Sequence, residues 1–150
     1  MNECSICYAQ KTNFVALTCR HEFCANCIEK QLHFNIYCAF CKTPITACNP
    51  PIIKPSNKYI KIEGNGGEQL EIIIKTVKIN NKCCVVVTNN ASNKYPFQKG
   101  DLIISINGLP VSNHLLLRDL IMFLDSFEIQ VKRKYTVKTF LNKMLAIKKC

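Results

Sequence analysis

Several familiar features are missing from this chain of 150 residues, and each absence narrows its class. No uninterrupted apolar run is long enough to cross a bilayer, since the longest candidate, 115–124, is broken by Arg118 and Asp119. The opening residues MNECSIC contain no apolar leader, so we expect no secretory signal. We therefore expect a soluble protein of the cytoplasm, with the nucleus as an alternative, and discount a framework of disulfides. Nucleophile elbow, P-loop and dinucleotide fingerprint are also missing.

Acidic residues are scarce at one end of the chain. The net charge is +10, and residues 132–150 contribute seven basic and no acidic side chains. Because the basic excess belongs to this tail, we do not expect the folded parts to bind nucleic acid. Residues 134–150 predict a basic amphipathic helix, which would bind an acidic partner or membrane surface, or pack on the preceding domain. Its apolar face comprises Val137, Phe140, Leu141, Met144 and Leu145.

Cysteine, in contrast, is abundant near the N-terminus. In the first 41 residues, seven cysteines and one of the two histidines have metal-ligand spacing: Cys4, Cys7, Cys19, His21, Cys24, Cys27, Cys38 and Cys41. A two-residue gap lets both thiolates of a pair reach one metal, and eight ligands satisfy two tetrahedral zinc ions with no position left for water. The sites are therefore predicted to be structural. Spacing alone leaves open whether the ligand pairs are used sequentially or interleaved.

The order of these ligands, three Cys, one His and four Cys, resembles that of the RING finger family. The resemblance implies a small cross-brace domain with interleaved ligand pairs and a short helix within 24–32. The first zinc ion would be held by Cys4, Cys7, Cys24 and Cys27, and the second by Cys19, His21, Cys38 and Cys41. A segment as short as 1–48 has too little apolar material to fold alone, so zinc would supply its stability.

RING domains bind a ubiquitin-conjugating enzyme charged with ubiquitin, and this implies roles for four residues. Ile6, Leu17 and Phe40 would form the apolar surface that contacts the conjugating enzyme, and Lys42 would help to position ubiquitin. Lysine lacks the planar fork of the arginine that is typical there.

The sequence departs from the RING family at two other positions. Ala39 stands where many active members have proline, and Gln31 stands where many have tryptophan. The loss of the aromatic side chain removes apolar contact area, which weakens the expectation of ligase activity.

Prolines separate this region from the rest of the chain. We expect a semi-rigid linker over 49–57, because Pro44, Pro50, Pro51 and Pro55 favour extended backbone. A second domain follows over 58–133, and the tail over 134–150. Within the second domain, runs rich in Ile and Val predict strands, and HLLLRDLIMFL predicts a helix over 114–124 capped by Ser112 or Asn113. The predicted strands are 70–77, 83–88, 101–106 and 128–133.

The second domain resembles the PDZ family at KGDLIISINGLPV, residues 99–111. This implies a groove that binds peptides by strand addition, with Gly67-Glu68-Gln69-Leu70 as its carboxylate-binding loop. Glu68 and Gln69 replace an apolar residue and a glycine, so we expect weak binding of peptide termini and equal scope for internal peptides or folded partners. Some PDZ domains read a peptide hydroxyl with a histidine at the helix start; for His114 we favour a capping or surface role.

The sequence thus predicts an α+β protein. It comprises a two-zinc RING domain, a small PDZ-like barrel or sandwich with one main helix, and a basic C-terminal helix. Two functions remain open: a ubiquitin ligase whose second domain recruits a substrate protein or peptide, and a zinc-dependent adaptor without ubiquitin transfer. Ubiquitin and its conjugating enzyme are partners only in the first.

Overall fold

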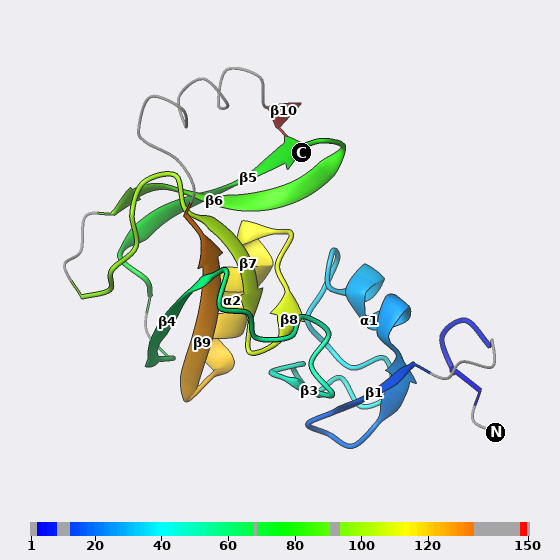
Figure 1. Cartoon of the computed structure of the whole chain (residues 1–150). Coiled ribbons are helices and arrows are strands. Elements are labelled where there is room, and N and C mark those ends of the chain that lie inside the picture. Colours follow the sequence, from blue (N-terminus) through cyan, green and yellow to red (C-terminus); the bar gives the residue numbers. More distant parts are fainter. Residues whose placement is uncertain (1–2, 9–12, 68, 91–93, 134–147, 150) are drawn as a thin grey trace.

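The computed structural model describes residues 3–8, 13–67, 69–90, 94–133 and 148–149, which form a small N-terminal region and a larger β-rich region (Figure 1). Strands and helices occur in both regions, so the α+β class is confirmed. None of the helices in these residues has the length and apolar character needed to span a bilayer.

A three-stranded antiparallel sheet and one helix build the N-terminal region. The strands β1 (Phe14–Leu17), β2 (Glu22–Cys24) and β3 (Cys48–Asn49) are ordered β2-β1-β3, and α1 (Ala25–Gln31) lies within the predicted helix 24–32. Phe23, Ile28 and Ile45 are completely buried between them. So small a core gives limited stability on its own, which fits a fold that depends on metal.

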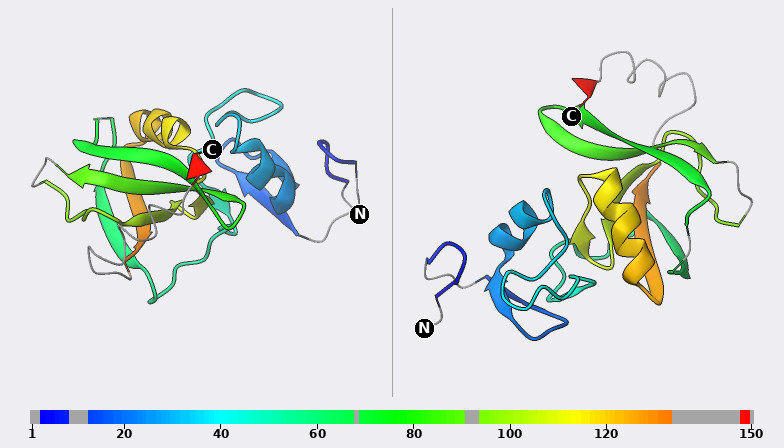
Figure 2. Two further views of the ribbon diagram at one scale, coloured as in Figure 1. Left: turned by 90° about the horizontal axis from the view of Figure 1, so that it is seen from above. Right: turned by 180° about the vertical axis from the view of Figure 1, so that it is seen from behind.

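The β-rich region is one antiparallel sheet with a helix on one face (Figure 2). Its strand order is β10-β5-β6-β7-β9-β4, with the short β8 paired to β7. The elements are β4 (Ile60–Asn65), β5 (Ile72–Ile79), β6 (Lys82–Asn90), β7 (Leu102–Ile106), β8 (Leu109–Pro110), α2 (His114–Phe123), β9 (Ser126–Lys132) and β10 (Lys148–Lys149). The four predicted strands and the predicted helix all correspond to elements of this region.

The predicted barrel is not confirmed. In the described residues the sheet begins at β10 and ends at β4, and no strand pairing joins these two edges. Helix α2 buries Leu117, Leu120 and Ile121. The apolar face of the sheet is therefore covered by a helix, and a closing strand is not needed to remove it from water.

The turn Asn107-Gly108 joins the two regions. The Asn107 side-chain amide donates to the Thr46 carbonyl at 3.3 Å, and the Ile53 N–H donates to the Gly108 carbonyl at 2.8 Å. Buried residues of both regions belong to a single apolar cluster. Residues 49–57 therefore run along an interface between the regions.

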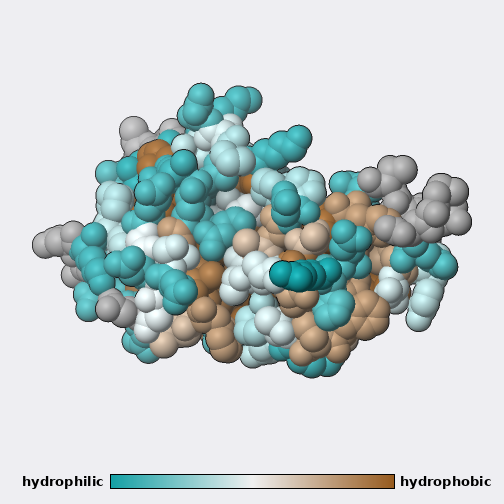
Figure 3. Space-filling model, turned by 90° about the horizontal axis from the view of Figure 1, so that it is seen from below, coloured by the Kyte–Doolittle hydropathy of each residue, from teal (hydrophilic) through white to brown (hydrophobic). Residues whose placement is uncertain are grey.

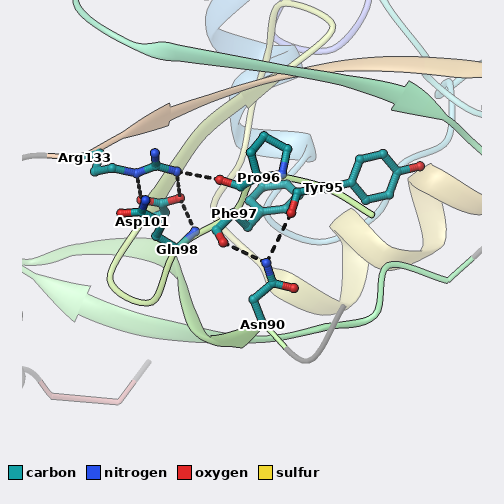
Figure 4. A network of polar contacts seen from close by, with 7 residues as sticks. All are labelled: Asn90, Tyr95, Pro96, Phe97, Gln98, Asp101 and Arg133. Carbon is teal, nitrogen blue, oxygen red and sulfur yellow. Dashed lines mark hydrogen bonds and ion pairs between the residues drawn. The ribbon is translucent and has the colours of Figure 1, made fainter. Parts of the chain in front are cut away.

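A buried ion pair connects the start of β7 to the end of β9 (Figure 4). Asp101 is 1% exposed and accepts hydrogen bonds from Arg133 at the end of β9 and from the Gln98 N–H at 2.8 Å. Arg133 also donates to the Pro96 carbonyl at 2.8 Å, and the Asn90 amide donates to the Phe97 carbonyl at 2.7 Å. These bonds attach the loop before β7 to strands β6 and β9.

Candidate metal centres and docking surfaces

Four thiols from three parts of the N-terminal region converge on the first metal centre. Cys4 and Cys7 come from the chain's first turn, Cys24 from the end of β2, and Cys27 from α1, and their sulfurs lie within 4.8 Å of one another. The Cys4–Cys27 and Cys7–Cys24 sulfurs are 3.8 and 3.9 Å apart. A zinc–sulfur bond of about 2.3 Å gives a tetrahedral edge of about 3.8 Å, so this set fits a zinc ion.

The second centre combines three thiols with one imidazole. The Nδ1 atom of His21 lies 3.4 Å from the Cys19 sulfur and 3.3 Å from the Cys38 sulfur, and Cys41 completes the group. A tetrahedral zinc ion needs a sulfur–nitrogen edge of about 3.5 Å, so this set fits zinc as well. The tight β1–β2 turn, in which the Leu17 N–H donates to the His21 carbonyl at 2.9 Å, brings Cys19 and His21 together.

Both outer CxxC pairs have the same backbone shape. The residue after each pair, Tyr8 or Lys42, has φ of 59° and donates its N–H to the carbonyl of the first cysteine, Cys4 or Cys38. A left-handed residue at this position lets the chain turn around a metal. The two outer CxxC pairs therefore end in the same kind of backbone turn.

The thiols of the first centre need a cation between them when they are deprotonated. Burial raises the pKa of Cys27, and the neighbouring thiols of Cys24, Cys7 and Cys4 raise it further. At Cys4, burial is outweighed by hydrogen bonds from backbone N–H groups, chiefly that of Cys24, which lower its pKa to about 6. So many thiolates repel one another unless a positive ion lies between them, and zinc removes this conflict.

The family comparison agrees with this geometry. Residues 1–48 match the family described as zinc finger, C3HC4 type (RING finger). No solved structure is significantly similar to the chain. Residues 1–48 therefore form a RING-type zinc finger whose two ligand sets are interleaved and fit two zinc ions. The geometry decides between the interleaved and sequential pairings that the spacing left open.

The predicted contact residues for a conjugating enzyme differ in exposure. Ile6 and Phe40 are 37% and 57% exposed, and the Phe40 ring rests on Phe23 with the centroids 5.4 Å apart. Leu17 is only 4% exposed, because the alternation of β1 points Val15 and Leu17 into the core. Its side chain is therefore not available for the surface contact expected of it. On the face seen from below, apolar side chains gather over the zinc-finger half of the molecule (Figure 3).

Gln31, Ala39 and Lys42 are the other positions of the zinc finger that the sequence singled out. The Gln31 side-chain amide donates to the Asn35 side-chain oxygen at 3.3 Å and to the Tyr37 carbonyl. It thus braces the loop after α1, a role that its polar character alone did not predict. Lys42 is exposed directly after the last zinc ligand, and Ala39 is exposed in the same loop.

A groove lies between the start of β5 and α2. It has a volume of about 710 Å³ and is lined by Gln69, Leu70, Glu71, Ile72, Ile73, Arg118, Asp119, Ile121 and Met122. Two residues of the predicted loop, Gln69 and Leu70, thus lie at the groove, whereas residue 68 is outside the described part. The N–H groups of Gly66 and Gly67 already donate to the carbonyls of Asp125 and Ile121.

His114 joins the start of α2 to β5. Its Nδ1 atom lies 2.6 Å from the hydroxyl of Thr76 on β5, and its backbone N–H donates to the same hydroxyl at 2.9 Å. Burial, and secondly the charge of Arg118, lower the pKa of His114. The helix cap is Asn113, whose side-chain oxygen accepts from the Leu115 N–H at 2.9 Å.

Most of the predicted basic tail, residues 134–147 and 150, lies outside the described residues. Lys148–Lys149 form β10, which pairs with Val77 and Lys78 of β5. The predicted helix over 134–150 is therefore wrong at these two positions, where pairing with a sheet edge replaces it. The apolar face expected of the tail stays a prediction.

Proposed function

We propose that this protein is a RING-type ubiquitin ligase that holds a ubiquitin-charged conjugating enzyme for transfer to a recruited substrate. The observation that carries the proposal is the zinc finger itself: each of its two outer zinc loops presents an exposed apolar side chain, Ile6 on the first and Phe40 on the second. The zinc ions supply a rigid fold. No residue of this chain forms a covalent intermediate.

Each residue then has a defined task. Ile6 and Phe40 bury apolar surface against the conjugating enzyme, and Phe40 is held in place by Phe23 and the zinc ligand His21. Lys42 donates hydrogen bonds toward the bound ubiquitin. The acceleration comes from orientation, because one reactive arrangement of the thioester is selected from many.

Substrate recruitment is assigned to the groove between β5 and α2. The succession of β4 to β9 with α2 before the last of them resembles the order of elements in PDZ domains, and it supports a PDZ-like docking role. On the outer edge of β5, only Val77 and Lys78 are paired with β10 in the described residues, so an extended peptide can add beside Ile72 and Ile73. Apolar groove residues would receive its side chains.

A discharge assay tests the ligase activity directly. Zinc-loaded protein is mixed with a panel of ubiquitin-charged conjugating enzymes, and loss of the thioester to free lysine is followed. Ile6→Ala should slow discharge by about tenfold or more, as expected for loss of a central contact. Ile60→Ala is the matched control, because Ile60 is also 37% exposed but lies on β4. Absence of discharge with every enzyme would refute the ligase.

The alternative is a zinc-dependent adaptor, and Gln31 favours it. This side chain braces the Asn35–Tyr37 loop, where an aromatic residue would offer apolar contact area. An adaptor would capture its partner through the groove without ubiquitin transfer. In that case Ile6→Ala leaves partner capture intact, whereas Met122→Glu in the groove abolishes it.

A further inference from the structure

Two sides of helix α2 make different contacts. One side, with Arg118, Ile121 and Met122, forms a wall of the groove. Another side faces the zinc finger, where Leu116, Leu117 and Leu120 line a small cavity together with Leu32 and Ile36. This cavity has a volume of about 20 Å³, which is room for at most about one water molecule. The helix is therefore closely packed against the zinc finger on this side.

Further contacts hold both ends of α2. Before its first turn, the Ser112 hydroxyl lies 2.8 Å from the Nδ1 atom of His33. At its last turn, the Phe123 ring meets the edge of Tyr37, with centroids 6.4 Å apart and planes at 76°. All these partners come from the loop that follows α1.

That loop is anchored by the metal centres. It lies between Cys27, a ligand of the first site, and Cys38, a ligand of the second. Gln31 donates to the Tyr37 carbonyl, and the Ile45 N–H donates to the Ile36 carbonyl at 2.6 Å. Because zinc-finger folding depends on its metal, the loop has no fixed shape once the metal is removed.

We propose that the zinc finger positions α2 through Leu32, Ile36 and Tyr37, so that the groove depends on zinc although no zinc ligand lines it. The zinc ligand Cys38 fixes the neighbouring Tyr37, and the Tyr37 ring in turn contacts Phe123 on α2. In the metal-free protein the helix loses its packing on this side and opens more often. The significance of the groove for substrates rests on the proposed function, but the coupling itself does not.

Amide hydrogen exchange of the full chain tests this coupling. Residues 114–123 should exchange at least about tenfold faster after zinc is removed with EDTA, while Val85–Val87 in the buried centre of β6 change far less. Unchanged protection of α2 in protein whose zinc finger has unfolded would overturn the proposal. Equal loss at Val85–Val87 would also overturn it, because the metal would then hold the whole chain. No ubiquitin, conjugating enzyme or peptide enters this measurement.

A variant separates positioning from general unfolding. Tyr37 is 40% exposed, so Tyr37→Ala should keep both zinc ions yet raise exchange at the C-terminal turn of α2 by several-fold. Ile60→Ala, with a similar exposed fraction of 37%, is the control and should leave α2 unchanged. If Tyr37→Ala binds two zinc ions and α2 exchanges as in the wild type, Tyr37 is not a positioning residue and the proposed path is wrong.

Discussion

Arg133 binds Asp101 through two parallel hydrogen bonds, of 2.8 Å from Nε and 2.7 Å from Nη2 (Figure 4). The carboxylate is 1% exposed, whereas the arginine side chain is 24% exposed. This hydrogen-bonded pair raises the pKa of Arg133 and joins the loop before β7 to the end of β9. Among the described residues, the buried charge is thus compensated by the Arg133 side chain and by the Gln98 N–H.

Arg133→Met should therefore be strongly destabilising. It leaves a buried carboxylate without its cation, and we expect the free energy of unfolding to fall by about 3 kcal/mol. The double variant Asp101→Asn with Arg133→Met should recover part of this loss, since no charge is then left buried. Urea denaturation followed by circular dichroism measures both. A loss below about 0.5 kcal/mol for Arg133→Met would mean that water replaces the guanidinium.

Gly108→Ala should destabilise the joint between the two regions. Gly108 has φ of +80°, and an added Cβ would lie 2.5 Å from the Cβ of Pro51. Gly67→Ala is the matched control, because Gly67 has φ of +77° but open space around its Cβ position. We expect both to lose about 1 kcal/mol to backbone strain, and only Gly108→Ala to lose a further ~1–3 kcal/mol through the clash. Equal melting temperatures of the two variants would argue against a tight joint.

The protein should bind two zinc ions per chain, and removal of a ligand from one centre should lower zinc binding at that centre. Cys38→Ser removes a ligand of the second centre and should leave about one tightly bound ion. Cys48→Ser is the control, since Cys48 belongs to neither ligand group, and it should keep both ions. Elemental analysis of purified, dialysed protein gives the count. Two retained ions in Cys38→Ser would contradict the ligand assignment.

The rate of thioester discharge should depend on the shape of the side chain at position 42 as well as on its charge. Under the proposed function, Lys42→Arg should speed thioester discharge because the guanidinium offers a planar fork of donors, and Lys42→Ala should slow it several-fold. Lys, Arg and Ala at this position must all adopt the same left-handed backbone conformation, with φ of 59°, so the backbone strain is the same in the three proteins. Lys30→Ala, on the helix α1, serves as a charge control. Equal rates for all the variants would remove Lys42 from the transfer step.

His114 should make stability depend on pH. Its pKa is lowered from 6.5 in the folded protein, chiefly by burial, so the unfolded chain takes up the proton first as the pH falls. The contribution of the neutral imidazole is therefore fully present above about pH 6.5 and is lost as the pH falls from there through the lower folded-state pKa. His114→Asn should flatten the stability profile in this window, and an unchanged profile in this variant would contradict the assignment. Zinc content is checked at each pH by elemental analysis.

The zinc finger could be predicted because its chemistry is local. Metal ligands must follow fixed spacings, so the pattern from Cys4 to Cys41 is enough to indicate two zinc sites, whereas the ligand order indicates their interleaving only by resemblance. Leu17 shows the limit of such reasoning. A position two residues before Cys19 suggested a surface contact, but strand alternation in β1 places this side chain in the core.

The β-rich region was only partly predictable. Runs such as LEIIIKTV and the helix 114–124 have clear periodicity and appear where expected. Strand β4 was missed, because IKIEGN is short, half polar and followed by glycines, and it becomes a strand through six residue pairs with β9. The expected barrel or sandwich is not confirmed for a similar reason, because strand periodicity does not determine which strand edges will pair.

The sequence by itself determined the zinc chemistry, because ligand type and spacing act over a few residues. It also indicated four of the strands and the helix 114–124 through their apolar patterns, whereas the helix within 24–32 was expected by resemblance. Only the tertiary structure decided the joint at Asn107-Gly108, the burial of Asp101 with Arg133, and the packing of α2 between the groove and the zinc finger. These contacts join residues that are distant along the chain, and the free energy that selects them comes from shape and burial, which exist only after the chain has folded.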